Sequence, residues 1–235
     1  MESNWNINRR VIGNMFNLNA AYIPGGGTGA GKNSVFASPS LSIIVLCTLS
    51  FFLEMIPGIG DAYFNAFYFD PNYLVTRPWT LITYIFLHNG LVHLLFNMLV
   101  LYFFGTALER RIGNKQLLAI FFTAGVLSAI GYTFLSQPIF NISPGPMIGA
   151  SGAIYGVFAA LTIIEPDIRV YVYFVPMKLK HALVLFALLD FLMVNSSDMI
   201  AHTAHLSGLF VGLYMGFRIK KIQENALRSR YIGRW

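Results

Sequence analysis

The sequence predicts an all-α membrane protein, a bundle of six transmembrane helices with both termini in the cytoplasm. Of its 235 residues, 56% are hydrophobic and only 11% are charged, whereas soluble domains carry about 25% charged residues. Apolar runs approach the ~20 residues that cross the core of a bilayer, and they cover residues 40–56, 79–105, 117–135, 147–164, 181–195 and 203–219. Of the 16 Lys and Arg residues, all except Arg77 fall on the side that this topology makes cytoplasmic, as the positive-inside rule requires.

We divide the chain into three parts. Residues 1–39 form a polar, glycine-rich cytoplasmic segment, residues 40–220 the six-helix domain, and residues 221–235 a basic cytoplasmic tail. The first apolar run is no removable signal peptide, because some 39 residues precede it. Under this topology the net charge of +6 faces lipid headgroups, so the expected partner is the lipid bilayer and not nucleic acid. The compact plan favours a bacterial inner membrane.

The composition of the individual runs and loops gives further information about them. The first run contains the only cysteine, Cys47, which excludes an internal disulfide. Residues 57–78 are rich in proline, glycine and aromatic residues, which is typical of a loop partly embedded in the membrane interface. The fourth run follows a loop with two prolines, and the fifth, the least regular of the six, contains Asp190.

Four polar side chains are predicted to lie at one depth. Ser151 and His205 stand 14 and 13 residues before the first cytoplasmic charge that follows each of them. At ~1.5 Å per helical residue, both lie about 20 Å from the cytoplasmic face. His93 and Asn97, 16 and 12 residues before the corresponding charge of the second run, bracket the same layer. The shared depth indicates a single site.

Small residues predict how two of these helices pack. Gly152 and Gly156 in the fourth run, and Gly208 and Gly212 in the sixth, have the small-xxx-small spacing that lets helix backbones approach closely in lipid. These glycines adjoin the serine and the histidine of the predicted site. Close packing of the two helices would therefore bring the serine hydroxyl to the imidazole.

The chemistry follows from the start of the fourth helix. Gly149 and Ser151 lie at a helix N-terminus inside the membrane, where backbone N–H groups have no partner within the helix. A nucleophile placed there gains donors for a developing oxyanion. Serine needs a base, and histidine is the usual one. We therefore predict a Ser–His dyad with Ser151 as the nucleophile and His205 as the general base.

At these residues the chain resembles the rhomboid family of intramembrane serine proteases, over about residues 40–220. The GxSG motif of that family appears as residues 149–152. The resemblance gives the role of nucleophile to Ser151 and that of general base to His205.

The second run carries a further part of the resemblance. The family pattern of histidine, four residues, histidine, three residues and asparagine appears as His88, His93 and Asn97. It implies that His93 and Asn97 help to form the oxyanion hole, while His88 caps the second helix or anchors the loop before it. Tyr155 matches the aromatic residue that packs against the catalytic imidazole.

Two further segments match family positions that have a structural role and no part in the reaction. Glu109 and Arg111 match structural residues of the loop after the second span. The family often has Trp-Arg before that span, where this chain has Trp79 and Thr80. Because that pair stabilises the first loop in the family, the departure concerns loop stability and not the reaction.

The resemblance implies an enzyme that cleaves transmembrane segments of membrane proteins without a cofactor or a metal. One alternative is a catalytically silent relative that binds membrane-protein clients, although such relatives typically lack the serine or the histidine. A second is a transporter or channel with an anion site at the helix start, which would want an inverted repeat or a charged pathway, and neither is evident.

Three polar residues of the last runs remain outside the predicted machinery. We expect His181 and His202 to be interfacial and to titrate without consequence. Asp190 lies near the middle of the membrane and is expected below the dyad, in a polar contact inside the bundle rather than in catalysis.

Overall fold

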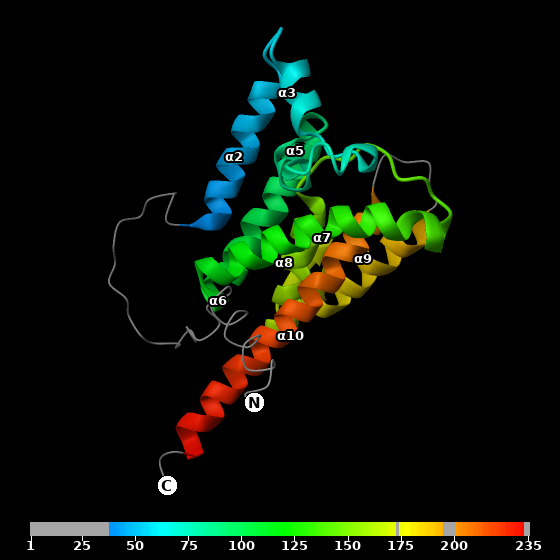
Figure 1. Cartoon of the computed structure of the whole chain (residues 1–235). Helices are drawn as coiled ribbons and strands as arrows, with labels where there is room; N and C mark the ends of the chain where they lie inside the picture. Colours follow the sequence, from blue (N-terminus) through cyan, green and yellow to red (C-terminus); the bar gives the residue numbers. More distant parts are fainter. Residues whose placement is uncertain (1–37, 173, 195–200, 233–235) are drawn as a thin grey trace, which may run out of the picture.

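The computed structural model describes residues 38–172, 174–194 and 201–232, and this part of the chain is predominantly helical (Figure 1). Its elements are α2 (Pro39–Glu54), α3 (Gly60–Phe67), η2 (Pro71–Tyr73), α4 (Thr80–Thr83), η3 (Tyr84–Phe86), α5 (Gly90–Val100), the π-helical turn η4 (Leu101–Gly105), α6 (Thr106–Ile112), α7 (Asn114–Phe140), α8 (Ser151–Ile164), β1 (Arg169–Val172), β2 (Val175–Lys178), α9 (Leu179–Met193) and α10 (His202–Ile232). Almost all of the expected N-terminal segment lies outside the described residues.

Two helices among the described residues are long and apolar enough to cross a membrane. One is the continuous stretch Gly90–Ile112, formed by α5, η4 and α6, and the other is α7. The helices α2 and α8 are also apolar but shorter. Length and composition therefore agree with an integral membrane protein.

The second apolar run, predicted as a single span over residues 79–105, is not one helix. The short turns α4 and η3 come first, and a break over residues 87–89 follows before α5 begins at Gly90. The sequence His88-Asn89-Gly90 is a turn signal, because Asn-Gly favours a backbone with positive φ, and Gly90 has φ +84°. The helix then continues beyond residue 105 to Ile112.

The centre of the molecule is the mutual packing of α7, α8 and α10, each of which contacts the other two (Figure 1). A Cβ added to Gly208 would collide with the carbonyl oxygen of Gly152, and one added to Gly212 would collide with that of Gly156. The two backbones therefore touch at the predicted glycines, and larger side chains are excluded from this contact.

The helix α2 lies to one side of this core (Figure 1), and a carboxylate joins its start to α6. Glu109 accepts hydrogen bonds from the Ser38 and Ser40 hydroxyls, at 2.9 and 2.8 Å, and from the Ser40 backbone N–H at 3.1 Å. A negative charge at a helix N-terminus is favourable because the helix dipole is positive there. Glu109 thus has a structural position between two helices.

The first loop is held by an arginine three residues before the position expected from the resemblance. Arg77 donates to the carbonyl oxygen of Asn65 at 2.7 Å, and its guanidinium lies 4.1 Å from the ring centroid of Tyr73. Thr80 is buried and donates to the Arg77 carbonyl oxygen at 2.6 Å. The loop therefore has a guanidinium anchor although residue 80 is threonine.

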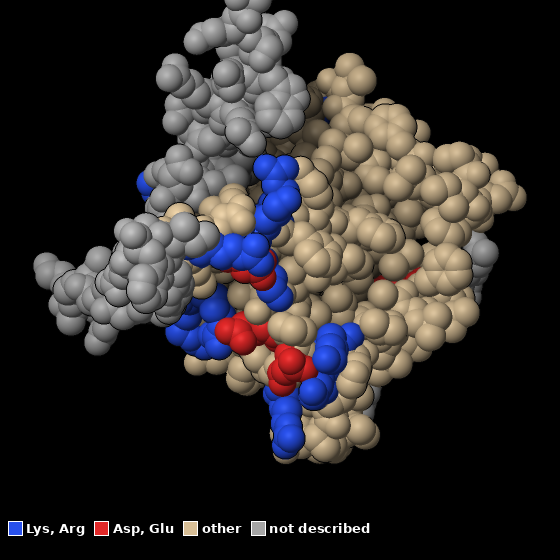
Figure 2. Space-filling view, turned by 90° about the horizontal axis from the view of Figure 1, so that it is seen from below, with Lys and Arg blue, Asp and Glu red and all other residues tan. Residues whose placement is uncertain are grey.

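Charged side chains gather at one end of the bundle. Figure 2 shows Lys, Arg, Asp and Glu side chains close together on the face that is lower in Figure 1. Arg111 pairs there with Glu165 at 2.9 Å. A two-stranded antiparallel hairpin that the sequence did not predict, β1 and β2, lies between α8 and α9. The helix α10 runs without a break to Ile232, so the first part of the expected tail continues the last helix.

Candidate active site

Ser151 is the first residue of α8, and the segment before it is fixed by the backbone. Met147 exchanges two hydrogen bonds with Phe69, at 2.8 and 3.1 Å, and the Gly149 N–H donates to the Tyr84 carbonyl oxygen at 2.9 Å. Gly149 has φ +113°, a conformation that side chains disfavour. The chain is thereby turned so that α8 starts with its N–H groups free of any side-chain cap among the described residues.

The imidazole of His205 meets the serine. His205 Nε2 lies 2.8 Å from Ser151 Oγ, and this hydrogen bond joins the first turn of α10 to the first residue of α8. Tyr155, one turn further along α8, stacks on the His205 ring with 4.5 Å between centroids and an interplanar angle of 12°. A hydroxyl and a base at hydrogen-bond distance are the arrangement that nucleophilic catalysis by serine requires.

One prediction about the neighbours of His205 is confirmed and one is wrong. Asp190 makes a polar contact inside the bundle, as expected, and its partner is the imidazole of the predicted pair, with Oδ1 2.9 Å from His205 Nδ1. His202 is not interfacial: it is 5% exposed, and its Nδ1 lies 2.5 Å from the same Asp190 oxygen. His181, in contrast, is exposed.

The sequence did carry a signal for one of these residues. His202 and His205 are three apart, so they share a face once this segment is a helix. For Asp190 there was only the general rule that an acid inside a membrane helix has a partner. Nothing in the spacing named that partner.

The helix α5 places His93 and Asn97 beside the loop that leads to Ser151. A Cβ on Gly149 would lie only 2.8 Å from Cε1 and 3.0 Å from Nε2 of His93, so this imidazole packs against the backbone that leads to Ser151. His93 Nδ1 accepts from the Asn89 N–H at 3.2 Å. Asn97, one turn later, is 7% exposed and donates through Nδ2 to the His93 carbonyl oxygen at 2.9 Å.

His88 lies behind these groups. It is 2% exposed, its Nδ1 lies 3.2 Å from the Phe86 carbonyl oxygen, and its ring centroid is 5.2 Å from that of His93. It does not line the cavity described next. Its position is therefore consistent with a structural role, in which His88 stabilises the break before α5.

A cavity of about 930 Å³ opens at the serine, and it is lined by residues of α5, of the loop before α8, of α8 and of α10. Ser151, His205, His93 and Asn97 all border it. Its surface mixes these polar groups with aromatic and aliphatic side chains such as Phe96. Such a space can hold an extended peptide with one carbonyl carbon against the serine.

The same region holds side chains that could bind a metal ion. Asp190, His202 and His205 each offer one ligand atom, and these atoms lie within 4.8 Å of one another. The donor set of one carboxylate and two imidazoles suits zinc. However, the Nδ1 atoms of both imidazoles are directed at Asp190 Oδ1, so hydrogen bonds already account for this arrangement.

Comparisons with known proteins give a consistent result. A model of the Rhomboid domain matches residues 75–222. "Putative rhomboid protease YdcA" of Bacillus subtilis (strain 168) is 34% identical over 146 residues, which cover 59% of this chain and 66% of YdcA. The rhomboid proteases GlpG of Salmonella paratyphi A and Salmonella newport are each 32% identical over 191 residues, which cover 77% of this chain and 63% of GlpG. The chain thus spans somewhat under two thirds of the length of these relatives.

Proposed function

Because the chain belongs to the rhomboid family, we propose that it is an intramembrane serine endopeptidase that cleaves transmembrane segments of other membrane proteins. The observation that carries the proposal is the 2.8 Å hydrogen bond between Ser151 Oγ and His205 Nε2 at the start of α8. A silent, client-binding relative would need neither group in this geometry. The relatives named above support the same reading, since they are named as proteases.

The first half of the reaction is acyl transfer. His205 Nε2 takes the proton from the Ser151 hydroxyl as Oγ attacks a peptide carbonyl carbon in the cavity. The tetrahedral intermediate then collapses as the carbon–nitrogen bond breaks, and His205 returns the proton to the leaving amine. The remaining part of the substrate stays on Ser151 as an ester.

The negative charge of the intermediate needs donors that are already in place. The Ser151 backbone N–H has no partner within α8, because the first N–H groups of a helix lie before its first internal hydrogen bond. His93 and Asn97 border the same cavity and complete the proposed oxyanion hole. Their N–H groups would donate to the oxygen on which the negative charge develops. Stabilisation of this charge is the largest single contribution to catalysis in many acyl-transfer enzymes.

The second half is hydrolysis of the ester by water, again with His205 as the base. A regular transmembrane helix hides its carbonyl groups in internal hydrogen bonds. The substrate must therefore unwind near the scissile bond, and small or helix-breaking residues are expected there. This chemistry requires neither a cofactor nor a metal.

We place the protein in a bacterial inner membrane as a six-span bundle whose spans, within residues 40–220, belong to α2, the α5–α6 stretch, α7, α8, α9 and α10. Both termini are proposed to be cytoplasmic. The charged end of the bundle in Figure 2 supports this orientation, since cations favour the cytoplasmic side. The bacterial sources of the relatives support the location.

The test compares wild-type protein with Ser151→Ala and with the matched control Ser143→Ala, which changes an exposed serine outside the cavity. Each purified protein is given a fluorescent transmembrane substrate and, separately, a fluorophosphonate probe that labels activated serines. We expect cleavage and labelling by wild type and the control, and neither by Ser151→Ala.

Other results separate the alternatives. Equal cleavage by wild type and Ser151→Ala would refute the assignment of the nucleophile. Labelling without cleavage would support the serine and its base and reject the chosen substrate. If folded wild-type protein neither cleaves nor labels, the client-binding alternative is the better description.

A further inference from the structure

We propose that Asp190 is a positioning residue for His205, so that the site works as a Ser151–His205–Asp190 triad rather than as a dyad. This inference rests on the proposed protease function and adds a third member to its machinery.

The hydrogen bonds assign a role to each nitrogen of the imidazole. His205 Nδ1 faces Asp190 Oδ1 at 2.9 Å, and Nε2 faces Ser151 Oγ at 2.8 Å. An ionised carboxylate only accepts hydrogen bonds, so Nδ1 must carry the hydrogen. In the neutral ring Nε2 is then without one and can receive the proton of the serine hydroxyl. The carboxylate thus selects the tautomer that the reaction needs.

The ring is held in two further directions. Tyr155 stacks on its face, with 12° between the two planes, and this contact fixes the plane of the imidazole. Stacking alone does not decide which ring edge points at Ser151, because a turned ring would stack equally well. The bond from Nδ1 to Asp190 supplies that decision. Face and edge contacts together leave one productive orientation.

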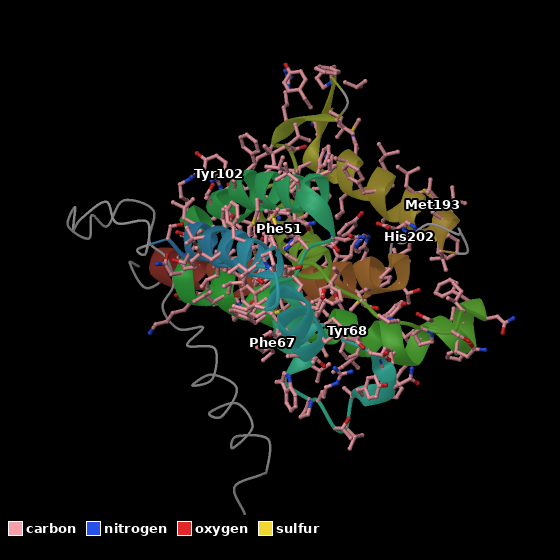
Figure 3. All side chains as sticks on the ribbon, turned by 90° about the horizontal axis from the view of Figure 1, so that it is seen from above. Phe51, Phe67, Tyr68, Tyr102, Met193 and His202 are labelled. Carbon is pink, nitrogen blue, oxygen red and sulfur yellow. The ribbon has the colours of Figure 1, made fainter. Side chains whose placement is uncertain are left out.

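The carboxylate itself is held by a second imidazole. His202 Nδ1 lies 2.5 Å from Asp190 Oδ1, and both side chains are 5% exposed. Figure 3 shows His202 beside the end of α9, where Met193 is labelled. In the described part of the chain, Asp190 has ion-pair contacts with these two histidines and with no Lys or Arg. A buried carboxylate is costly without partners, so both imidazoles act as its donors.

The bond pattern also accounts for the place of Asp190 in the chain. It lies in the last turn of α9, and both histidines lie in the first turn of α10. A structural contact between two helices could be made by any pair of polar groups. Here the acceptor meets the one ring nitrogen whose protonation controls the base, which is what a triad acid does.

The experiment measures kcat and KM separately for wild type, Asp190→Asn and the matched control Asp167→Asn, whose carboxylate is exposed on the charged face. The introduced amide has the shape of the acid but offers an N–H to Nδ1, which favours the tautomer with hydrogen on Nε2. We expect kcat to fall by about 100- to 10,000-fold, with KM changed less than about 3-fold. The rate of fluorophosphonate labelling should fall in parallel, and Asp167→Asn should match wild type.

A second variant covers the case in which Asp190→Asn folds poorly. Asp190→Ala removes the carboxylate and leaves space beside the imidazoles. Added sodium formate should then raise kcat with increasing concentration in this variant and leave wild type unchanged. Activities are compared per folded enzyme, with folding followed by circular dichroism.

Two results would overturn the triad: unchanged kcat in folded Asp190→Asn, or lost activity in Asp190→Ala that formate does not restore. Both presuppose active wild-type protein, so they differ from failure of the protease function. In that case wild type itself would neither cleave nor label.

Discussion

The ring of Tyr155 lies parallel to the imidazole of His205, with the two centroids 4.5 Å apart. The stack is made by the ring of the tyrosine and not by its hydroxyl. Tyr155→Phe is therefore expected to keep most of the activity, whereas Tyr155→Ala should lower kcat by about 10- to 100-fold because the imidazole loses a positioning contact. Steady-state kinetics on both variants checks this. A larger loss in Tyr155→Phe than in Tyr155→Ala would contradict the stacking role.

The glycine contacts between α8 and α10 predict a stability effect. A methyl group at Gly208 meets the carbonyl oxygen of Gly152, which is backbone and cannot turn away. Gly208→Ala should therefore destabilise the protein by about 1–3 kcal/mol through overpacking, and the displaced helix should carry His205 away from the serine. The matched control is Gly145→Ala, where an added Cβ meets no atom within 4 Å. Thermal unfolding in detergent distinguishes the two, and equal midpoints would count against the close helix contact.

The first loop gives a prediction about Arg77. Its guanidinium joins Asn65 and Tyr73 across the loop, so Arg77→Ala should lower stability by about 1 kcal/mol and hasten proteolysis of residues 57–78. Arg228→Ala, at an exposed position of α10, serves as the control.

The same loop predicts the outcome of introducing the family residue at position 80. Thr80 is 1% exposed, with its hydroxyl bonded to the Arg77 carbonyl oxygen. Thr80→Arg should therefore destabilise the loop, because a charged side chain would be buried without a partner. A stabilised Thr80→Arg protein would show that the loop can accommodate the charged side chain at this position.

Metal removal provides a further test of the reaction. The serine and imidazole carry out the proposed proton transfers by themselves, and the Nδ1 atoms near Asp190 are engaged in hydrogen bonds. Incubation with EDTA or 1,10-phenanthroline should therefore leave kcat/KM within about twofold of the untreated value. A loss that zinc restores would instead assign a resident metal to Asp190, His202 and His205.

The sequence predicted those parts of the molecule that depend on local pattern. The apolar runs locate the helices, and the glycine spacing in α8 and α10 corresponds to a backbone contact in the structure. The pairing of Ser151 with His205 followed from their similar distances to the cytoplasmic charges, 14 and 13 residues, and from the glycine spacing beside them. These features can be predicted from the rise per residue of a helix and from the spacing of its small residues.

The features that the sequence did not predict depend on where each helix ends and how the helices pack against one another. The last apolar run was predicted to cover residues 203–219, yet α10 continues to Ile232. The break before Gly90 was hidden inside an apolar run, because hydropathy averages over the Asn-Gly turn. The partners of Asp190 could not be named, because the sequence does not show that the ends of α9 and α10 meet. Tertiary packing decides these features.

Gly149 has a consequence for how relatives of this chain should be sorted. Its positive φ disfavours any side chain, and the His93 ring occupies the space where a Cβ would stand. A substitution there would misdirect the turn into α8 while leaving the proposed nucleophile Ser151 and the proposed base His205 unchanged. A survey that scores only the serine and the histidine would count such a protein as a working protease. Under the proposed mechanism, the residue without a side chain is therefore as diagnostic of activity as the proposed nucleophile and base.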